Sequence, residues 1–71
     1  MDPTELTPEM VRTEVARIDA AKGDDEGAHG MEDDLYALIL RMIATDRIAD
    51  AKACAQEALK TKLIDFARWC A

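Results

Sequence analysis

Aromatic side chains are scarce in this chain of 71 residues, at 4% of the total, and β-branched residues are also few. No stretch alternates apolar and polar residues in the way that a half-buried strand would. Alanine, by contrast, is abundant, and hydrophobic residues of all kinds make up 49% of the chain. Together these features favour an all-α fold over one built on a β-sheet.

Long apolar runs and a secretory leader are also missing. No apolar run approaches the roughly 18 residues of a membrane span, and the opening MDPTELTPEM has neither a basic region nor an apolar one. We therefore expect a cytoplasmic protein with no membrane partner. In that compartment Cys54 and Cys70 are expected to be reduced and packed rather than joined in a disulfide.

Basic residues are in the minority. Nine Lys and Arg residues stand against fifteen Asp and Glu residues, for a formal net charge of -6. Residues 1–34 hold eleven acids and three bases, whereas residues 35–71 hold four acids and six bases. Such a chain repels phosphate, which argues against direct nucleic-acid binding and favours a partner with a basic surface. The alternative is that the acids only keep a small protein soluble.

The length of the chain sets a further limit. One domain is expected, and a chain this short buries only about 60% of the surface that its unfolded form exposes. A large substrate pocket is therefore not expected. Below roughly 70 to 80 residues a single core seldom supplies more than about 3 to 5 kcal/mol of net stability, so a homodimer is one option.

What the chain does contain is one strongly apolar helix, predicted over residues 31–44, with no glycine or proline to interrupt it. Tyr36, Leu40 and Ile43 form a stripe on one flank of this helix. A helix that is apolar over most of its circumference must be covered on more than one side, so the other segments are predicted to cover it. Its inner stripe consists of Met31, Leu35, Leu38, Ile39 and Met42.

The triplet Thr7, Pro8, Glu9 is typical of a helix start, with an N-cap, a proline at the first position and an acid near the positive end of the helix dipole. The first helix is predicted from Pro8 to residue 21 or 22, and Gly23 is expected to end it with a positive φ. The preceding residues 1–6 are expected to be flexible. The inner stripe of this helix is Val11, Val15 and Ile18.

Asp24 is the next N-cap candidate, and two interpretations follow it. In one, a single helix begins at Asp25 and continues through Gly27 and Gly30 into the central stretch. In the other, the two glycines break the helix, which then begins near Met31. We favour the continuous helix, in which the glycines would let another backbone come close.

Asp50 is predicted to cap a third helix over residues 51–61, with Ala51, Ala55, Ala58 and Leu59 facing inward. Asp65 is predicted to cap a short carboxyl-terminal helix that places Phe66 beside Trp69 and Cys70. The predicted fold is therefore an all-α, small three-helix bundle with a short C-terminal aromatic helix, formed by residues 7–71.

Six carboxylates surround His29, the only histidine. On a continuous helix Glu26, His29 and Asp33 share one stripe, and Glu-x-x-His is half of the motif found in di-metal bundles. The other half is missing, and the acids around the glycines do not fit an EF-hand loop, so no metal and no cofactor is predicted. A thiol of Cys54 or Cys70 with His29 as its base is a remote enzymatic alternative, because no oxyanion loop accompanies them.

The segments GDDEGAH, EDDLYALILRMIA and IDFARWCA together resemble a group of short uncharacterised proteins encoded by actinobacterial phages and by their hosts. The resemblance covers about residues 15–71, and the ending DFARWCA is its most specific part. Gly27 and Gly30 depart from helix-friendlier versions of the pattern. The resemblance implies a bacterial cytoplasm and a phage-encoded accessory role, such as binding and modulating a host protein, and it implies no catalytic residue.

We predict a non-enzymatic protein-interaction module that docks on a larger protein through an apolar helix stripe, while its acids steer it toward a basic patch. In an alternative hypothesis, the acids mimic DNA and inhibit a nucleic-acid-binding protein. The predicted apolar contact residues are Tyr36, Leu40, Ile43, Phe66 and Trp69. In the alternative, the first three are covered by the other helices and the last two pack inward, so that all five belong to the core. The predicted acidic contact residues are Asp24, Asp25, Glu26, Glu32, Asp33 and Asp34.

Overall fold

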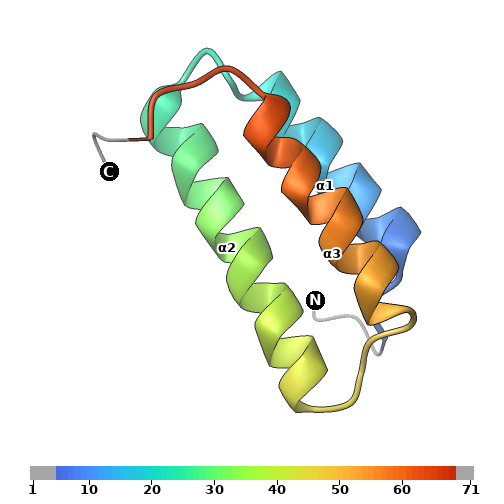
Figure 1. Ribbon diagram of the computed structural model, residues 1–71. Helices are drawn as coiled ribbons and strands as arrows, with labels where there is room; N and C mark the ends of the chain where they lie inside the picture. The colour runs from blue at the N-terminus through green and yellow to red at the C-terminus, as the bar shows by residue number, and fades with distance from the viewer. Residues whose placement is uncertain (1–4, 69–71) are drawn as a thin grey trace.

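The computed structural model describes residues 5–68, which contain three α-helices and one short 3₁₀-helix (Figure 1). The α-helices are α1 (Pro8–Ala20), α2 (Asp25–Ala44) and α3 (Ala51–Leu59), and the 3₁₀-helix η1 (Lys60–Leu63) continues α3. Helices α1 and α3 run in one direction and α2 runs in the other, and all three pack against one another. This arrangement confirms the prediction of a small all-α three-helix bundle.

Three of the four predicted N-caps are confirmed, at the starts of α1, α2 and α3. Oxygens of the Thr7, Asp24 and Asp50 side chains each accept a hydrogen bond from the backbone N–H three residues later, at 3.2, 3.1 and 3.0 Å. Pro8 fills the first position of α1. The N–H groups satisfied in this way are ones that an α-helix cannot pair internally, so the caps fix where each helix begins.

The end of α1 differs in one detail from the prediction. The helix stops at Ala20, and Gly23 does not have the expected positive φ. The chain leaves α1 through successive turns instead, the last of which joins the Asp24 N–H to the Ala21 carbonyl at 2.9 Å. Turns of this kind need only right-handed conformations, so no left-handed glycine is required.

Helix α2 is continuous through both glycines, as the favoured interpretation predicted. A Cβ atom added at Gly27 would lie 2.6 Å from Oδ2 of Asp24, so glycine leaves room there for the capping carboxylate. At Gly30 a Cβ atom would meet nothing within 4 Å. The prediction that the glycines let another backbone come close is therefore wrong.

The core lies where the three helices meet, and both predicted inner stripes contribute to it. Val11 and Ile18 of α1 are buried, with Val15 partly buried beside them, and the inner stripe of α2 packs against the same cluster. The buried hydrophobic residues are Leu6, Val11, Ile18, Ala28, Leu35, Ile39, Met42, Cys54, Ala58, Ile64 and Phe66.

Leu6 is part of this core, so the prediction that residues 1–6 are flexible is wrong at its last position. Its side chain is 1% exposed. Its backbone N–H donates to the Arg47 carbonyl at 2.9 Å, and its carbonyl accepts from the Ala49 N–H at 2.8 Å. These two bonds form a parallel bridge between Leu6 and Ile48 that ties the segment before α1 to the loop between α2 and α3.

Helix α3 is rotated relative to the prediction. Cys54 and Ala58 are buried, whereas Ala55 is exposed and Leu59 is 60% exposed, although both were predicted to face inward. Alanines lie on two roughly opposite sides of this short helix, with Ala53 opposite the others, so their spacing does not identify the buried face. Cys54 behaves as a small apolar residue and takes the core position.

The predicted helix after Asp65 is absent from residues 65–68. Ile64 is already extended, with φ -81° and ψ 129°. The guanidinium of Arg68 donates hydrogen bonds to the carbonyls of Thr61, Ile64 and Phe66 at 2.7, 3.3 and 3.2 Å. The carboxyl-terminal segment is therefore held by a side chain instead of by helical hydrogen bonds. Trp69 and Cys70, the other members of the predicted helix, lie outside the described residues.

Candidate functional site

The predicted apolar stripe on α2, formed by Tyr36, Leu40 and Ile43, is partly open to solvent. Leu40 is 68% exposed and Ile43 is 45% exposed, near the carboxyl-terminal half of the helix. Tyr36 is half-buried, because its hydroxyl shares a hydrogen bond with Oγ1 of Thr61 and Lys62 lies over its ring at 5.5 Å. We call Tyr36, Leu40 and Ile43 the outer stripe. Its solvent-exposed part is Leu40 and Ile43.

Two further leucines that the sequence did not identify are exposed. Leu59 at the end of α3 is 60% exposed, and Leu63 at the end of η1 is 86% exposed. The prediction placed Leu59 inside the bundle, so the rotation of α3 adds one large apolar side chain to the surface. No periodicity in a nine-residue helix rich in alanine would have identified this face.

Phe66 is not available as a contact residue. Its side chain is 7% exposed and lies beneath the guanidinium of Arg68, whose central carbon is 3.8 Å from the ring centroid. The assignment of Phe66 to the partner-binding set is therefore corrected, in favour of the core position that the sequence also allowed. Trp69, the other aromatic of that set, lies outside the described residues.

Five of the six predicted acidic residues lie at the surface. Asp24, Asp25, Glu26, Asp33 and Asp34 are all exposed, in or just before the first three turns of α2. Three of them already have structural partners. Asp24 caps the helix, Oδ1 of Asp25 accepts from the Ala67 N–H at 3.1 Å, and Oδ1 of Asp33 lies 3.5 Å from Nε2 of His29. The exposed carboxylates make the amino-terminal end of α2 strongly negative.

Glu32, the sixth acidic residue, is an exception, because it is 1% exposed. Its two carboxylate oxygens accept from Nε and Nη2 of Arg68 at 3.0 and 2.9 Å, and Nζ of Lys62 lies 3.5 Å away. Glu32 therefore belongs to the interior, and its assignment to the acidic contact set is corrected. Sequence spacing could not have found this ion pair, since its partners are 36 residues apart.

The surroundings of Glu32 strongly favour its charged form. Burial alone would raise the pKa of this carboxyl, but hydrogen bonds from Arg68 and Thr61, with the positive charges of Arg68 and Lys62, lower it to about 2. The same contacts raise the pKa of Arg68. The pair is therefore ionised on both sides and holds the carboxyl-terminal segment against α2.

His29 and Cys54 do not form a recognisable reactive pair. Nε2 of His29 lies 3.5 Å from Oδ1 of Asp33, and its buried Nδ1 has no hydrogen-bond partner among residues 5–68. Sγ of Cys54 donates to the Ala49 carbonyl at 3.4 Å, and burial, together with the charge of Asp50, raises the pKa of this thiol. A raised pKa keeps the thiol protonated and lowers its reactivity as a nucleophile.

Metal-binding geometry is likewise not found in the described part of the chain. Between residues 5 and 68, no group of three or more His, Cys, Asp or Glu side chains is arranged to hold a metal ion. Of the predicted stripe of Glu26, His29 and Asp33, only His29 and Asp33 are in contact, at 3.5 Å.

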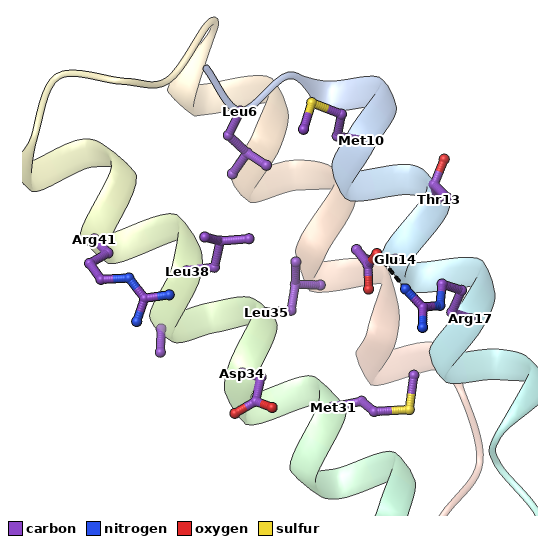
Figure 2. Close-up of a pocket in the computed structure, with 11 residues that line it drawn as sticks. Leu6, Met10, Thr13, Glu14, Arg17, Met31, Asp34, Leu35, Leu38 and Arg41 are labelled. Atoms are coloured by element: carbon purple, nitrogen blue, oxygen red, sulfur yellow. Dashed lines mark hydrogen bonds and ion pairs between the residues drawn. The ribbon is translucent and has the colours of Figure 1, made fainter. Parts of the chain in front are cut away.

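A groove of about 650 Å³ separates α1 from α2 on the face that α3 leaves open (Figure 2). Its floor is apolar and includes Leu6, Met10, Met31, Leu35 and Leu38. Charged side chains line its two rims, Glu14 and Arg17 on α1 and Asp34 and Arg41 on α2.

This α1/α2 groove was not predicted, although its position has a signal in the sequence. Asp34 and Arg41 share a helix face with Leu38, next to the inner stripe of α2. Leu38 and Leu40 are two positions apart, or about 200° around the helix. The groove and the outer stripe therefore lie on different flanks of α2.

Taken together, these features define a small helical bundle with two separate apolar surfaces and one acidic end. No protein-family model, curated protein or solved structure matches this chain. In the part of the chain that the structure describes, no helix combines the length and the hydropathy that a membrane span requires.

Proposed function

We propose that this protein is a small, acidic, non-enzymatic interaction module that binds a larger protein through the outer stripe of α2. The observation that carries this proposal is the exposure of Leu40 and Ile43, 68% and 45%, on a helix whose opposite face forms the core. Exposed aliphatic side chains on a regular helix offer a rigid apolar contact surface.

Charge would guide this contact. The exposed carboxylates at the start of α2 give the module a negative end, and such a field speeds the approach of a partner with a basic patch. By this proposal the acids set the rate of association, whereas Leu40 and Ile43 supply the affinity. The resemblance to phage-encoded proteins extends the proposal to a host protein in a bacterial cytoplasm that the module binds and modulates.

The DNA-mimic hypothesis draws support from a narrower set of residues than the sequence suggested. Glu26 and Asp34 are exposed and free to face a nucleic-acid-binding protein, and Asp33 is exposed but lies 3.5 Å from Nε2 of His29. Glu32 is buried, however, and Asp25 is engaged by Ala67. Fewer carboxylates are then available to imitate the phosphates of DNA, which favours binding through the outer stripe over DNA mimicry.

Affinity capture from a bacterial host, followed by mass spectrometry and a binding measurement with the recovered partner, tests the proposal. The key variant is Leu40→Glu, and Ala16→Glu at an exposed position of α1 is the matched control, since it makes the same change in charge. We expect Leu40→Glu to weaken binding at least about tenfold, because it places a charge in an apolar contact. Ala16→Glu should leave the affinity nearly unchanged.

Salt separates the two hypotheses. Affinity carried by the outer stripe should persist between about 0.05 and 0.5 M salt, whereas affinity carried by the carboxylates should collapse over that range. Binding that is lost in salt and is indifferent to Leu40→Glu would favour DNA mimicry and overturn the apolar mode.

A further inference from the structure

Two opposite charges lie unpaired on the α2 rim of the α1/α2 groove. Asp34 and Arg41 are both exposed, and neither side chain makes a hydrogen bond or an ion pair with another of residues 5–68. On the facing rim, by contrast, Arg17 and Glu14 pair with each other at 3.1 Å (Figure 2). The groove therefore offers one negative and one positive group to a molecule that enters it.

The spacing of these two charges has a simple geometric consequence. Asp34 and Arg41 are seven positions apart, so they lie on nearly the same face of α2, about 10.5 Å from each other along the axis. Their midpoint falls between Ala37 and Leu38, which also line the groove. A second identical helix that runs antiparallel about that midpoint presents its own charges in the reverse order.

We propose that the α1/α2 groove binds a second copy of this chain, with the two α2 helices antiparallel. A two-fold axis between Ala37 and Leu38 places Asp34 of each copy opposite Arg41 of the other. The same patch then serves both subunits, as the symmetry of a two-fold dimer requires. Both rim charges gain a partner, and the interface contains two symmetric ion pairs.

The apolar residues of the groove fit the same arrangement. Ala37 is exposed and small, so two helices can approach closely at the axis. Leu38 and Met31 are only partly buried within one copy, and Met10 is 37% exposed. The second α2 helix would cover these three side chains.

A second copy fits this rim better than a foreign helix of uniform charge. A wholly basic segment would pair with Asp34 but face Arg41, and a wholly acidic one would do the reverse. An antiparallel copy satisfies both groups at once. The contact consists of one helix face of each copy and two exposed ion pairs, so the dimer is expected to be weak, with a Kd of about 10 μM or above.

This inference goes beyond the proposed function and does not depend on it. The outer stripe lies on the other flank of α2 and stays accessible in the dimer. Loss of the dimer would leave the outer stripe, which supplies the affinity for a host protein, unchanged, so the two proposals can fail separately.

Sedimentation equilibrium of the full chain at low salt, from about 5 μM to 1 mM, tests the dimer. We expect a reversible monomer–dimer equilibrium. Asp34→Arg and Arg41→Asp should each raise the Kd about tenfold or more, because each turns two attractive pairs into two repulsive ones. Lys52→Asp, at an exposed position of α3 outside the interface, makes the same change in charge as Arg41→Asp and should leave the Kd within about twofold.

A mixture of the two single variants gives the sharper measurement. Asp34→Arg carries two positive groups on this face and Arg41→Asp carries two negative ones, so the two proteins should form a mixed dimer although neither forms its own. The double variant Asp34→Arg/Arg41→Asp restores complementarity within one sequence and should dimerise like the wild type.

Two results would overturn the proposal. One is a protein that stays monomeric up to about 1 mM at low salt. The other is a dimer whose Kd does not change in the single variants, or does not recover in the mixture and in the double variant, since either finding would place the contact on another face.

Discussion

Glu32 is the side chain that holds the carboxyl-terminal segment in place. It is charged, it is 1% exposed, and its partner Arg68 also binds three backbone carbonyls and stacks on Phe66. An ion pair with a buried carboxylate is not strongly stabilising in itself, because the carboxylate has lost its hydration, whereas the Arg68 side chain is still 26% exposed. What the pair does confer is a large penalty for removing the guanidinium alone, since Glu32 is then left buried without it.

Arg68→Met should therefore destabilise the protein by about 3 kcal/mol, at the low end of the range for an unpaired buried charge, since Lys62 still lies near Glu32. Urea unfolding near pH 7 measures this change. The double variant Glu32→Leu/Arg68→Met should recover much of the loss, because neither charge is then left without its partner. A single variant as stable as the wild type would show that the ion pair does not hold this segment.

Glu32 also makes the stability depend on pH in the acid range. Its pKa is about 2 in the folded protein, against an ordinary value of 4.5. Between these two values the unfolded chain binds a proton that the folded protein does not. The stabilisation is complete above about pH 4.5 and is lost as the pH falls toward 2, with a total of at most about 3 kcal/mol.

Comparison of the wild type with Glu32→Gln isolates this dependence. Unfolding measured in steps from about pH 2 to pH 7 should show the difference in stability between the two proteins widening as the pH rises from 2 to 4.5 and then levelling off. A difference that stays constant across this range would mean that the Glu32 pKa is not lowered in the folded protein.

Helix α2 shows how a residue that is unfavourable in a helix can still be required at one position. Gly27 lies in its first turn and Gly30 in its second, and glycine weakens a helix by about 1 kcal/mol relative to alanine. The two sites differ in their surroundings, because only Gly27 faces the carboxylate that caps the helix. Substitution with alanine should therefore have different effects at the two positions.

Gly30→Ala is expected to stabilise the protein by about 1 kcal/mol, since its Cβ meets open space and the helix gains propensity. Gly27→Ala gains the same propensity but displaces Asp24 from a cap of about 1 kcal/mol, so its net effect should be close to zero. Thermal unfolding of both variants measures the contrast. Equal stabilisation by the two would show that the cap does not depend on glycine.

Local signals in the sequence predicted the starts of α1, α2 and α3 and the inner stripes of α1 and α2, because a cap acts within three residues and a stripe follows from spacing along one helix. The same kind of cap signal at Asp65 predicted a helix that residues 65–68 do not form. Thr7, Asp24 and Asp50 are examples, and the continuity of α2 follows from its cap and its apolar half. The rotation of α3 was missed because alanine does not distinguish one side of a helix from another. Partner residues far apart in sequence, such as Glu32 and Arg68, were missed because no spacing rule connects them.

The candidate surfaces show the same division. Leu40 and Ile43 were assigned to a contact stripe, with full burial inside the bundle as the open alternative, and they are exposed. Phe66 and Glu32 were assigned to contact surfaces and are buried instead. Their burial depends on how the carboxyl-terminal segment folds against α2, which the sequence did not predict. The α1/α2 groove depends on how two helices pack, which spacing within either helix cannot determine.

The core of the whole bundle includes Leu6, a residue predicted to be flexible. Leu6 enters the core ahead of α1, and its backbone joins the loop after α2. A chain of this length has few core side chains, so each large one contributes an appreciable share of the total stability.

Leu6→Ala should reduce the free energy of unfolding by about 2 to 4 kcal/mol, as expected when a buried leucine leaves a cavity. Leu63→Ala is the matched control, because Leu63 is 86% exposed and its truncation should change stability by less than about 0.5 kcal/mol. Chemical denaturation monitored by circular dichroism compares the two. A Leu6→Ala variant as stable as Leu63→Ala would mean that the segment before α1 is dispensable.

The bridge between Leu6 and Ile48 also bears on the order in which the protein folds. It joins positions separated by most of the folded chain, so its formation must overcome the entropy of closing a long loop, whereas each helix forms from neighbouring residues. The bridge should therefore be among the last contacts to form and among the first to open. Amide hydrogens of Leu6 and Ala49 should then exchange with solvent faster than those in the middle of α2, through brief openings that leave the helices intact.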